Sequence, residues 1–478
     1  MNLVTRNLIS RWSQLGPRFL PFADVASPDL PLSRLLRLSL FQVSVGMALV
    51  LLVGTLNRVM IVELAVPASL VAIMVALPVL YAPLRALIGF RSDNHRSALG
   101  WRRVPFIWMG TLVQFGGLAV MPFALLVLSG GGNASAWPSW IGPMGAGLAF
   151  LLVGAGLHTT QTAGLALATD LAPVESQPKV VGLMYVMLLL GSIVSAVIFG
   201  ALLVDFSPGR LVQVIQASAV VTIVLNTIAL WKQETRRPAR LQREAAAPAP
   251  QFSQAWSAYL ETPGARRRLI AIALGTMAFS MQDVLLEPYG GQVLGLSVGG
   301  TTWLTAALAT GGLIGFWLAS VVLGRGSDPA RMAMAGAAVG VPAFVAVVLS
   351  GVNLSVPLFV AGVIGIGFGA GLFGHGTLTL TMNRAPKDQV GLALGAWGAV
   401  QATAAGVAVA FGGVMRDVVG ALASQGLFGA RLAVPTTGYA FVYIVEVALL
   451  MATVAVMGTL VSRTPPLALS RGLSIDAK

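Results

Sequence analysis

The sequence contains no cysteine and little charge. The absence of cysteine from all 478 residues excludes disulfide bonds, thiol catalysis and cysteine-bound metal. Only 10% of the residues are charged and 56% are hydrophobic, whereas about a quarter of the residues of a soluble domain are charged. Histidine is scarce as well, with three copies. This composition excludes an ordinary soluble protein and indicates a chain that lies in a membrane.

Sequence motifs of common enzymes are also missing. We find no phosphate-binding loop and no His-Glu-x-x-His metal motif. The glycine spacings lie inside apolar segments and do not follow predicted strands, which argues against dinucleotide binding. We therefore expect no enzyme activity and no dedicated metal site.

What the sequence has in quantity is long apolar segments. About twenty apolar residues are enough for a helix to cross a hydrocarbon core about 30 Å thick. We predict an all-α polytopic membrane protein with twelve transmembrane helices. Their expected ranges are 36–57, 64–88, 104–128, 141–166, 179–203, 211–231, 268–290, 300–323, 333–351, 356–382, 390–414 and 437–461.

The basic residues fix the expected orientation. The net charge is +13, and with the N-terminus inside, the outer connections hold only four of the 30 lysines and arginines, namely Arg58, Arg210, Arg416 and Arg431. This asymmetry follows the positive-inside rule and predicts that both termini are cytoplasmic. The basic excess is then a matter of topology, with attraction to anionic membrane lipids as a secondary role. We expect no nucleic-acid partner.

One long polar connection divides the chain. Residues 232–267 are rich in charge, alanine and proline, and we expect a cytoplasmic linker there. It separates a six-helix bundle at 36–231 from a second at 268–462. We expect a cytoplasmic segment with an interfacial helix at 1–35 and a cytoplasmic tail at 463–478.

Short echoes relate the two bundles to each other. "GFRSDNHR" at 89–96 and "GRGSDPAR" at 324–331 share Gly, Ser, Asp and Arg in the same register, and each joins the second and third spans of its bundle. "ATDLAPVESQPKVVGL" and "TMNRAPKDQVGL" echo each other between the fourth and fifth spans. The pattern indicates an internal duplication, with two six-helix pseudo-repeats related by an axis along the membrane normal.

The first echo resembles the loop motif of the major facilitator superfamily, so we expect the fold of that superfamily. Aspartate beside arginines and helix ends can form a charge-assisted latch between helices. It can equally hold a single loop in place, and most of these charges would serve topology in any case. The latch residues are Gly89, Asp93, Arg96, Gly100, Arg102 and Arg103, with Asp328 and Arg331 in the second half.

Two carboxylates interrupt the seventh span. Asp283 and Glu287 are four residues apart, which places them on one face of a helix. A carboxylate at mid-bilayer costs about 2.5–3.5 kcal/mol on an insertion scale, so function is the first hypothesis. Burial and mutual repulsion favour protonation of at least one of them. Alternatively, Glu287 lies solvated at the outer mouth beside Pro288.

Histidine marks the fourth and tenth spans. His158, Gln161 and Thr162 form a polar stripe on the fourth span, and His375 lies near the corresponding depth of the tenth. A neutral histidine can ligate a metal, including the magnesium of a chlorin, or relay protons. It can also make a polar contact between helices, worth about 0.6 kcal/mol on average. We take these four residues as candidates for a ligand site or a proton relay.

Longer strings resemble one family, the bacteriochlorophyll delivery (PucC/LhaA) family of the major facilitator superfamily. They lie at 40–64, 90–117, 156–173 and 277–306, and the similarity extends from about residue 30 to residue 460. The segment 19–48 looks closer to the LhaA branch, whose members assemble the light-harvesting core antenna. The resemblance makes His158, Gln161, Thr162 and His375 candidates for a pigment site. His158 and Gln161 fall within these strings, whereas His375 is a candidate for the chemistry of histidine alone.

The resemblance implies an assembly factor in the intracytoplasmic photosynthetic membrane, part of the bacterial inner membrane. Its expected cargo is bacteriochlorophyll. Its expected partners are the light-harvesting antenna α and β polypeptides and assembly intermediates of the reaction centre. The alternative is a proton-coupled secondary transporter of a small solute, with Asp283 and Glu287 carrying the coupling.

Overall fold

The computed structural model describes residues 30–80, 85, 88, 91–92, 101–173, 177–234, 257, 260–384 and 390–461. The predicted interfacial helix near the N-terminus, most of the predicted linker and the predicted tail lie outside the described residues. Within the described residues the secondary structure is helical, and eleven helices are long and apolar enough to cross a membrane.

The first half of the chain supplies six of the crossings. The first is nearly continuous and contains a π-helical stretch. The helices are α2 (Leu32–Leu38), α3 (Leu40–Leu49), η2 (Val50–Leu56) and η3 (Val59–Glu63), then α4 (Ala68–Leu80), α6 (Val104–Leu128), α7 (Ile141–Leu171), α8 (Gln177–Leu202) and α9 (Pro208–Leu230). A short 3-10 helix, η4 (Gly132–Ala136), joins α6 to α7.

The second half begins with a broken crossing and continues with five long helices. They are α12 (Ala265–Ser280), η7 (Met281–Val284) and α13 (Leu286–Gln292), then α14 (Val298–Gly324), α15 (Pro329–Val352), α16 (Val356–Arg384), α17 (Val390–Ser424) and α18 (Thr436–Gly458), with η8 (Ala430–Leu432) before α18. The predicted spans match these helices to within five residues, with three exceptions. The first crossing ends six residues after its predicted end, α4 has bounds that stop at Leu80 in a span predicted to 88, and α17 extends ten residues beyond its predicted end.

Besides these eleven helices, α4 forms a twelfth crossing, the second in chain order. Its continuous described part is shorter than the other crossings. Ser69 in its first turn contacts Asp417, near the end of α17. Helical residues recur at 85, 88, 91 and 92, and Ser92 contacts Arg103 at the start of α6. The segment therefore runs from one end of the bundle to the other. We call the end with Ser92 the terminal face and the end with Ser69 the opposite face.

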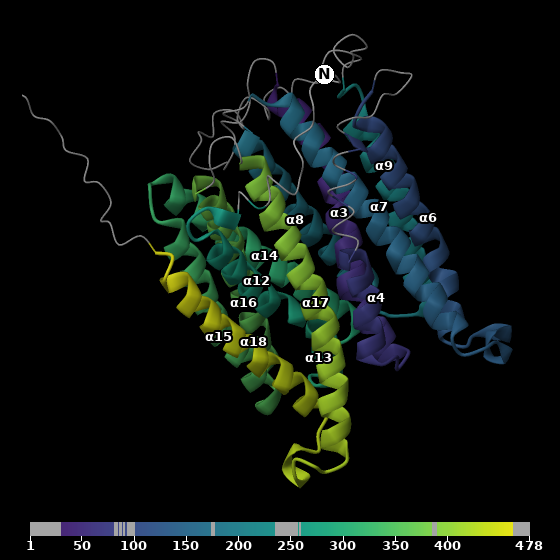
Figure 1. Cartoon of the computed structure of the whole chain (residues 1–478). Coiled ribbons are helices and arrows are strands. Elements are labelled where there is room, and N and C mark those ends of the chain that lie inside the picture. The colour runs from purple at the N-terminus through teal and green to yellow at the C-terminus, as the bar shows by residue number, and fades with distance from the viewer. Residues whose placement is uncertain are drawn as a thin grey trace, which may run out of the picture.

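The two halves repeat the same arrangement of neighbours. In the first half α6 packs on α7 and α9, and α3 packs on α8 and α9; in the second half α15 packs on α16 and α18, and α12 packs on α17 and α18. Two pairs join the halves, α4 with α17 and α8 with α14, and Figure 1 shows α17 beside α4 between the two bundles. This correspondence agrees with the duplication inferred from the sequence echoes.

Glycines let the helices approach closely at equivalent places. A Cβ atom on Gly110 or Gly156 would meet the facing backbone of α7 or α6, and a Cβ on Gly336 or Gly369 would meet that of α16 or α15. Small residues are the usual means of close helix packing in membranes. The glycine-rich run at 365–371 is therefore used, at least in part, to pack α16 against its neighbours.

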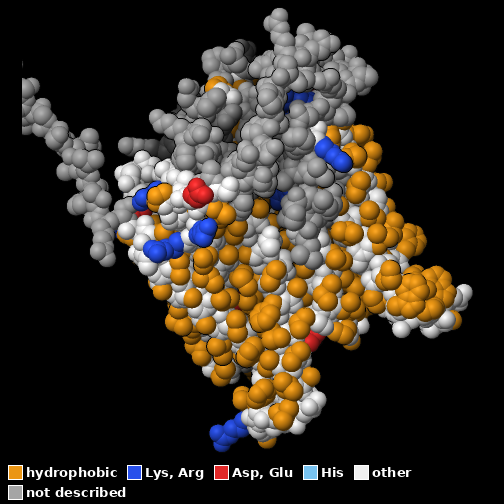
Figure 2. Space-filling model, in the orientation of Figure 1, with side chains coloured by type: hydrophobic (Ala, Val, Ile, Leu, Met, Phe, Trp, Pro, Cys, Tyr) orange, Lys and Arg blue, Asp and Glu red, His pale blue; other side chains and the backbone are white. Residues whose placement is uncertain are grey.

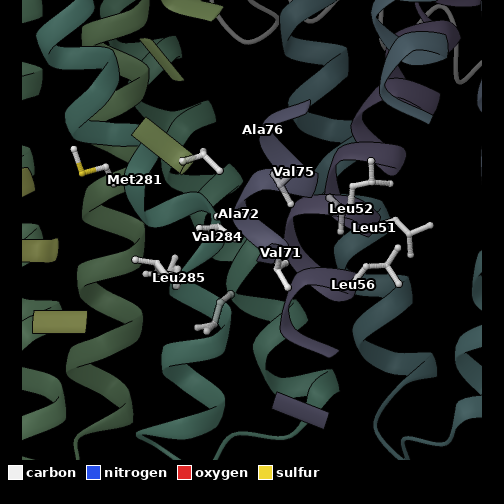
Figure 3. Close-up of a cluster of buried hydrophobic side chains, with 14 of the residues drawn as sticks. Leu51, Leu52, Leu56, Val71, Ala72, Val75, Ala76, Met281, Val284 and Leu285 are labelled. Atoms are coloured by element: carbon white, nitrogen blue, oxygen red, sulfur yellow. The ribbon is translucent and has the colours of Figure 1, made fainter. Parts of the chain in front are cut away.

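The outside of the bundle is apolar. Phe123 is 67% exposed on α6, as suits a side chain that faces lipid. Figure 2 shows hydrophobic side chains over the body of the molecule, while most visible lysines and arginines lie towards one end. The main core lies where the halves meet, with Leu51, Val71 and Leu285 packed together in Figure 3.

Polar contacts close the halves together towards the opposite face. Asn57 Nδ2 donates to the carbonyl of Asp283 over 3.2 Å, and Arg58 Nη2 donates to the carbonyl of Leu296 over 3.2 Å. The backbone N–H of Ser69 donates to Asp417 over 2.6 Å. All three contacts cross from one half to the other, so this end of the interface is shut.

Candidate functional site

A cavity of about 420 Å³ lies between the halves. That volume is in the range of sites for small molecules and cofactors. The first half contributes apolar and small residues from its first and fifth crossings, and the second half contributes the rest. The lining residues are Leu49, Val50, Val53, Gly54, Leu189, Ser192, Phe279, Gln282, Asp283, Leu286, Glu287, Thr305, Leu308, Ala309, Gly312, Phe316, Ile366, Gly367, Ala370 and Gly371.

The acidic part of the wall comes from the break in the seventh crossing. The α-helix stops at Ser280, gives way to a 3-10 turn, and restarts at Leu286. Pro288 lies in the first turn of α13, where its missing N–H removes no intrahelical hydrogen bond. Inside the turn, Gln282 Nε2 donates to the carbonyl of Phe279 over 3.2 Å and to Asp283 Oδ1 over 2.5 Å.

Glu287 lines the cavity and lies against Gly54, which has no side chain to block it. It is 3% exposed, and Thr305 Oγ1 donates a hydrogen bond to its Oε1. A Cβ atom on Gly54 would collide with that same carboxyl oxygen. The expectation that Glu287 lies solvated at an outer mouth is therefore wrong, because the π-helical stretch and α14 cover it.

Asp283 and Glu287 both line the cavity, but not as a pair on one regular helix. The backbone between them is a 3-10 turn followed by a new helix. The spacing argument, which assumed a continuous α-helix, was wrong about the backbone. Both carboxylates nevertheless line the same cavity, together with residues of the first crossing.

The polar stripe of α7 meets an arginine. Arg85 Nε donates to Thr162 Oγ1 over 3.1 Å, and Arg85 Nη2 donates to Gln161 Oε1 over 3.1 Å. Arg85 forms no ion pair with any residue that the structure describes. His158 lies close enough to interact electrostatically with Arg85, and its buried Nδ1 has no hydrogen-bond partner among the described residues. His158, Gln161 and Thr162 do not line the 420 Å³ cavity.

His375 lies beside the cavity instead. Its ring stands edge-on to Phe316, with centroids 4.3 Å apart, and Phe316 lines the cavity. Gly371, one helical turn earlier, lines it too. The Nδ1 atom of His375 has no hydrogen-bond partner within the described part of the chain, so His158 and His375 share this property on the matching helices α7 and α16. The described part of the chain contains no cluster of three or more His, Asp or Glu side chains arranged to hold a metal ion.

Two of the predicted latch residues, Arg102 and Arg103, contact another helix of the first half through an aspartate that was not predicted. Arg102 Nη2 and Arg103 Nε each donate to Asp170 at the end of α7 over 3.0 Å. Glu234, beyond α9, accepts hydrogen bonds from the backbone N–H groups of Arg102, Arg103 and Val104, and so caps the start of α6. The other predicted members, Gly89, Asp93, Arg96 and Gly100, lie outside the described residues.

The second copy of the motif caps a helix. Asp328 Oδ1 accepts a hydrogen bond from the backbone N–H of Ala330 over 2.9 Å, at the N-cap of α15. Arg331 is exposed and lines a groove of about 650 Å³ at the terminal face, together with Asp328 and Arg384. The residues of the first copy that match Asp328 and Arg331, namely Asp93 and Arg96, lie outside the described residues.

One buried acid was missed by the sequence analysis. Glu446 of α18 is 0% exposed and interacts electrostatically with Asp283. The signal was present, since Glu446 is the single charge in the apolar segment 436–458. It was overlooked because one charge does not prevent a segment from being predicted as a span.

Comparison with known proteins identifies relatives along nearly the whole chain. The family model described as "PUCC protein" matches residues 55–464. "Protein PucC" of Rhodovulum sulfidophilum is 64% identical over 420 residues, which cover 88% of this chain and 92% of that protein. "Protein PucC" of Rhodobacter capsulatus is 58% identical over 450 residues, covering 94% and 96%. The "Bacteriochlorophyll synthase 44.5 kDa chain" of Rhodobacter capsulatus is 29% identical over 391 residues, covering 80% and 86%.

Solved structures show the same fold at low sequence identity. A D-xylose-proton symporter has a TM-score of 0.66 at 14% identity, covering 88% of this chain and 96% of its own. An inward-facing, unoccupied bacterial homologue of the lysosomal transporter Spinster has a TM-score of 0.65 at 15% identity, covering 89% and 95%. The predicted major facilitator superfamily fold is confirmed. The predicted closeness to the LhaA branch stays a prediction.

Proposed function

Since this chain belongs to the PUCC protein family, we propose that it is an assembly factor for a light-harvesting antenna of photosynthetic bacteria. In this proposal it binds bacteriochlorophyll as cargo and holds antenna polypeptides while pigment is loaded. The client we propose is the core antenna that surrounds the reaction centre. No covalent chemistry is required of the protein, and the pigment is a guest.

The central cavity carries the proposal. Its wall is mainly aliphatic, aromatic and glycine. The polar side chains are Gln282, Asp283 and Glu287 from the seventh crossing, with Thr305 and Ser192. A hydrophobic guest with a few hydrogen-bonding groups suits such a wall, because ligand sites are usually apolar with a small number of polar groups that fix orientation.

His375 is the residue we propose for the polar contact with the guest. It lies next to cavity-lining Phe316 and Gly371, and its Nδ1 is free of other described partners. His158, Gln161 and Thr162 form a second candidate contact on α7, where Arg85 already occupies the oxygens of Gln161 and Thr162. Either histidine has the neutral ring nitrogen that a chlorin magnesium accepts.

The proposed surroundings follow from the family and from the charges. The protein crosses the membrane many times, and we propose the intracytoplasmic photosynthetic membrane with both termini cytoplasmic. Its partners there are the antenna α and β polypeptides, reaction-centre assembly intermediates and membrane lipids. A hydrophobic ligand reaches the cavity through the bilayer in this proposal. The contacts that close the interface between the halves at the opposite face agree with this route.

Purification from the native photosynthetic membrane in mild detergent tests the proposal. The expected result is bacteriochlorophyll absorbance and single-span antenna polypeptides in the purified sample, in amounts that fall with His375→Ala. The matched control is His95→Ala, in the connection between the second and third spans. A sample without pigment and without antenna polypeptides, from cells that are assembling antennae, would refute the proposal.

A second candidate function is proton-coupled transport of a small solute. The observation that favours it is the position of Asp283 and Glu287 in the wall of a cavity between two halves, in a fold shared with transporters. In sealed vesicles this function predicts solute uptake driven by a proton gradient and abolished by Asp283→Asn. The assembly function predicts no such uptake.

A further inference from the structure

Three buried polar groups meet between α18 and the break in the seventh crossing without hydrogen-bond partners for their oxygens. Glu446 is 0% exposed, and neither of its carboxyl oxygens has a partner among the described residues. Tyr443 lies three residues earlier on the same face of α18, and its hydroxyl is also unpartnered there. The side-chain oxygen of Gln282 is unpartnered as well. Tyr443 interacts electrostatically with Glu446, and Gln282 approaches the Glu446 carboxyl group with its backbone N–H.

The chemistry of these groups shows what is missing. An ionised carboxylate has only acceptors, and so has the amide oxygen of Gln282. The two therefore cannot satisfy each other, although a polar group left unsatisfied in a membrane interior costs several kcal/mol. A carboxylic acid group is uncharged and gains a donor, so protonation of Glu446 removes the cost of an ionised carboxylate in this dry interior.

We propose that Glu446 is a proton-binding site whose charge is coupled to that of Asp283 in the cavity wall. Gln282 precedes Asp283 in the turn, and its side-chain Nε2 donates to Asp283 Oδ1 over 2.5 Å. The backbone N–H of the same residue approaches the Glu446 carboxyl group. Two interacting carboxyl groups in a dry interior do not both ionise, and the charge on one controls the proton on the other.

The surroundings of Glu446 contain few other charges. On α18 it faces Tyr443 and Tyr439, and from α13 Tyr289 stacks against both tyrosines with ring centroids 5.4 Å apart. The ionisable groups of the other packed helices lie at their ends. They are Arg266, Arg267 and Arg268 in α12, Arg331 in α15, and Arg416 and Asp417 in α17.

The tyrosines extend the cluster towards the opposite face. Tyr439 donates to Gln292 Oε1 over 2.7 Å, and Arg416 Nη2 donates to the same oxygen over 2.6 Å. Tyr439 thus ties the outer end of α18 to α13, and Tyr443 lies between Tyr439 and Glu446 on α18.

The test is infrared spectroscopy of the full chain in detergent at neutral pH. The carbonyl stretch of a protonated carboxylic acid is distinct from the bands of a carboxylate. We expect Glu446→Gln to remove one such band and Tyr443→Phe to shift that band, because its carbonyl loses a donor. Leu450→Met, one turn further along α18, is the control and leaves the band unchanged.

Two results would overturn the proposal. One is an unchanged carbonyl region in Glu446→Gln. The other is loss of the band in wild type when sodium chloride replaces choline chloride, which would assign the site to a metal cation. If Glu446→Gln does not fold, the Tyr443→Phe shift decides the matter, and a band that does not shift contradicts the proposal.

The link to the cavity rests on the proposed function and has its own readout. Bacteriochlorophyll added to weakly buffered wild-type protein should change the pH by a fraction of one proton per bound pigment, and Glu446→Gln should abolish this change. Pigment that binds without any proton change contradicts the link. Pigment that does not bind contradicts the proposed function and leaves the infrared result standing.

Discussion

The two halves of the molecule have the same backbone arrangement and different polarity. Inside the first half, Arg85 is held by Gln161 and Thr162 with no carboxylate among its described contacts. Inside the second half, Glu287 and Glu446 are buried and Asp283 is half-buried, with no cation in direct contact among the described residues. The described residues of the first half give the cavity no ionisable side chain. The two halves thus share the packing of their helices and differ in the ionisable side chains that they offer to a bound ligand.

The reason for this division is physical. Close approach of two helices depends on backbone and small side chains, and a change there disturbs the whole bundle. A polar side chain facing an internal space is constrained only by its few partners. The halves are therefore expected to respond alike to changes in packing and differently to changes in polar residues.

The largest expected effect is from glycines at equivalent helix contacts. Gly156 of α7 faces the backbone of α6, and Gly369 of α16 faces that of α15. Replacement of either by alanine inserts a methyl group where backbone atoms already lie, and such overpacking costs about 1–3 kcal/mol. We expect similar drops in unfolding temperature in detergent for Gly156→Ala and Gly369→Ala.

Matched controls exist in both halves. A Cβ atom on Gly116 of α6 or Gly374 of α16 would meet nothing within 4 Å. Alanine there should leave the unfolding temperature unchanged or raise it, because glycine weakens a helix by about 0.5–1 kcal/mol relative to alanine. A large drop for Gly369→Ala with none for Gly156→Ala would show that the packing equivalence of the halves is superficial.

The next effect separates the two histidines. His375 lies beside the cavity, whereas His158 shares its surroundings with Arg85. We expect His375→Ala to weaken bacteriochlorophyll binding about tenfold, which corresponds to about 1.4 kcal/mol. We expect a smaller loss from His158→Ala, with membrane insertion intact for both. Titration of the purified variants by absorbance measures the two affinities. A larger loss from His158→Ala would place the pigment site in the first half.

The sequence predicted the helices well and their irregularities poorly. The third span was placed at 104–128, and α6 has those bounds. Hydropathy reports the thickness of a membrane, which every crossing must match. It says nothing of whether a crossing is one continuous helix, so the turn between Ser280 and Leu286 was missed, although Pro288 was a hint.

Contacts between distant segments were out of reach for a similar reason. The N-terminus of α4 is capped by Asp417, 348 residues away from Ser69 in the chain. Capping rules search only the few residues before a helix. The same holds for Arg85, whose partners lie on another helix. The polar stripe of α7 was visible in the sequence, but the arginine that occupies it was not.

A smaller effect is expected at the contact between Ser69 and Asp417. Asp417→Ala removes a cap worth about 1 kcal/mol, so it should shift the molecule several-fold towards states open at the opposite face. Because the chain has no cysteine, a single Val53→Cys reports this opening through its rate of reaction with a maleimide that cannot cross the membrane. Asp205→Ala, at an exposed and long ion pair, is the control. An equal labelling rate in both backgrounds would mean that Asp417 does not hold the halves together.

The smallest effect compares the N-terminal caps of the equivalent helices α15 and α6. Asp328 accepts a hydrogen bond from the backbone N–H of Ala330 in α15, whereas Glu234 accepts hydrogen bonds from three N–H groups at the start of α6 and lies beside the Arg103–Asp170 pair. We expect Asp328→Ala to cost about 0.5–1 kcal/mol, and Asp328→Asn to restore most of it, since asparagine is an equally good N-cap. Glu234→Ala should lower the unfolding temperature more than Asp328→Ala does, because it leaves three N–H groups without their partner. If Asp328→Ala lowered the unfolding temperature more than Glu234→Ala, Asp328 would have to contribute more to stability than a helix cap.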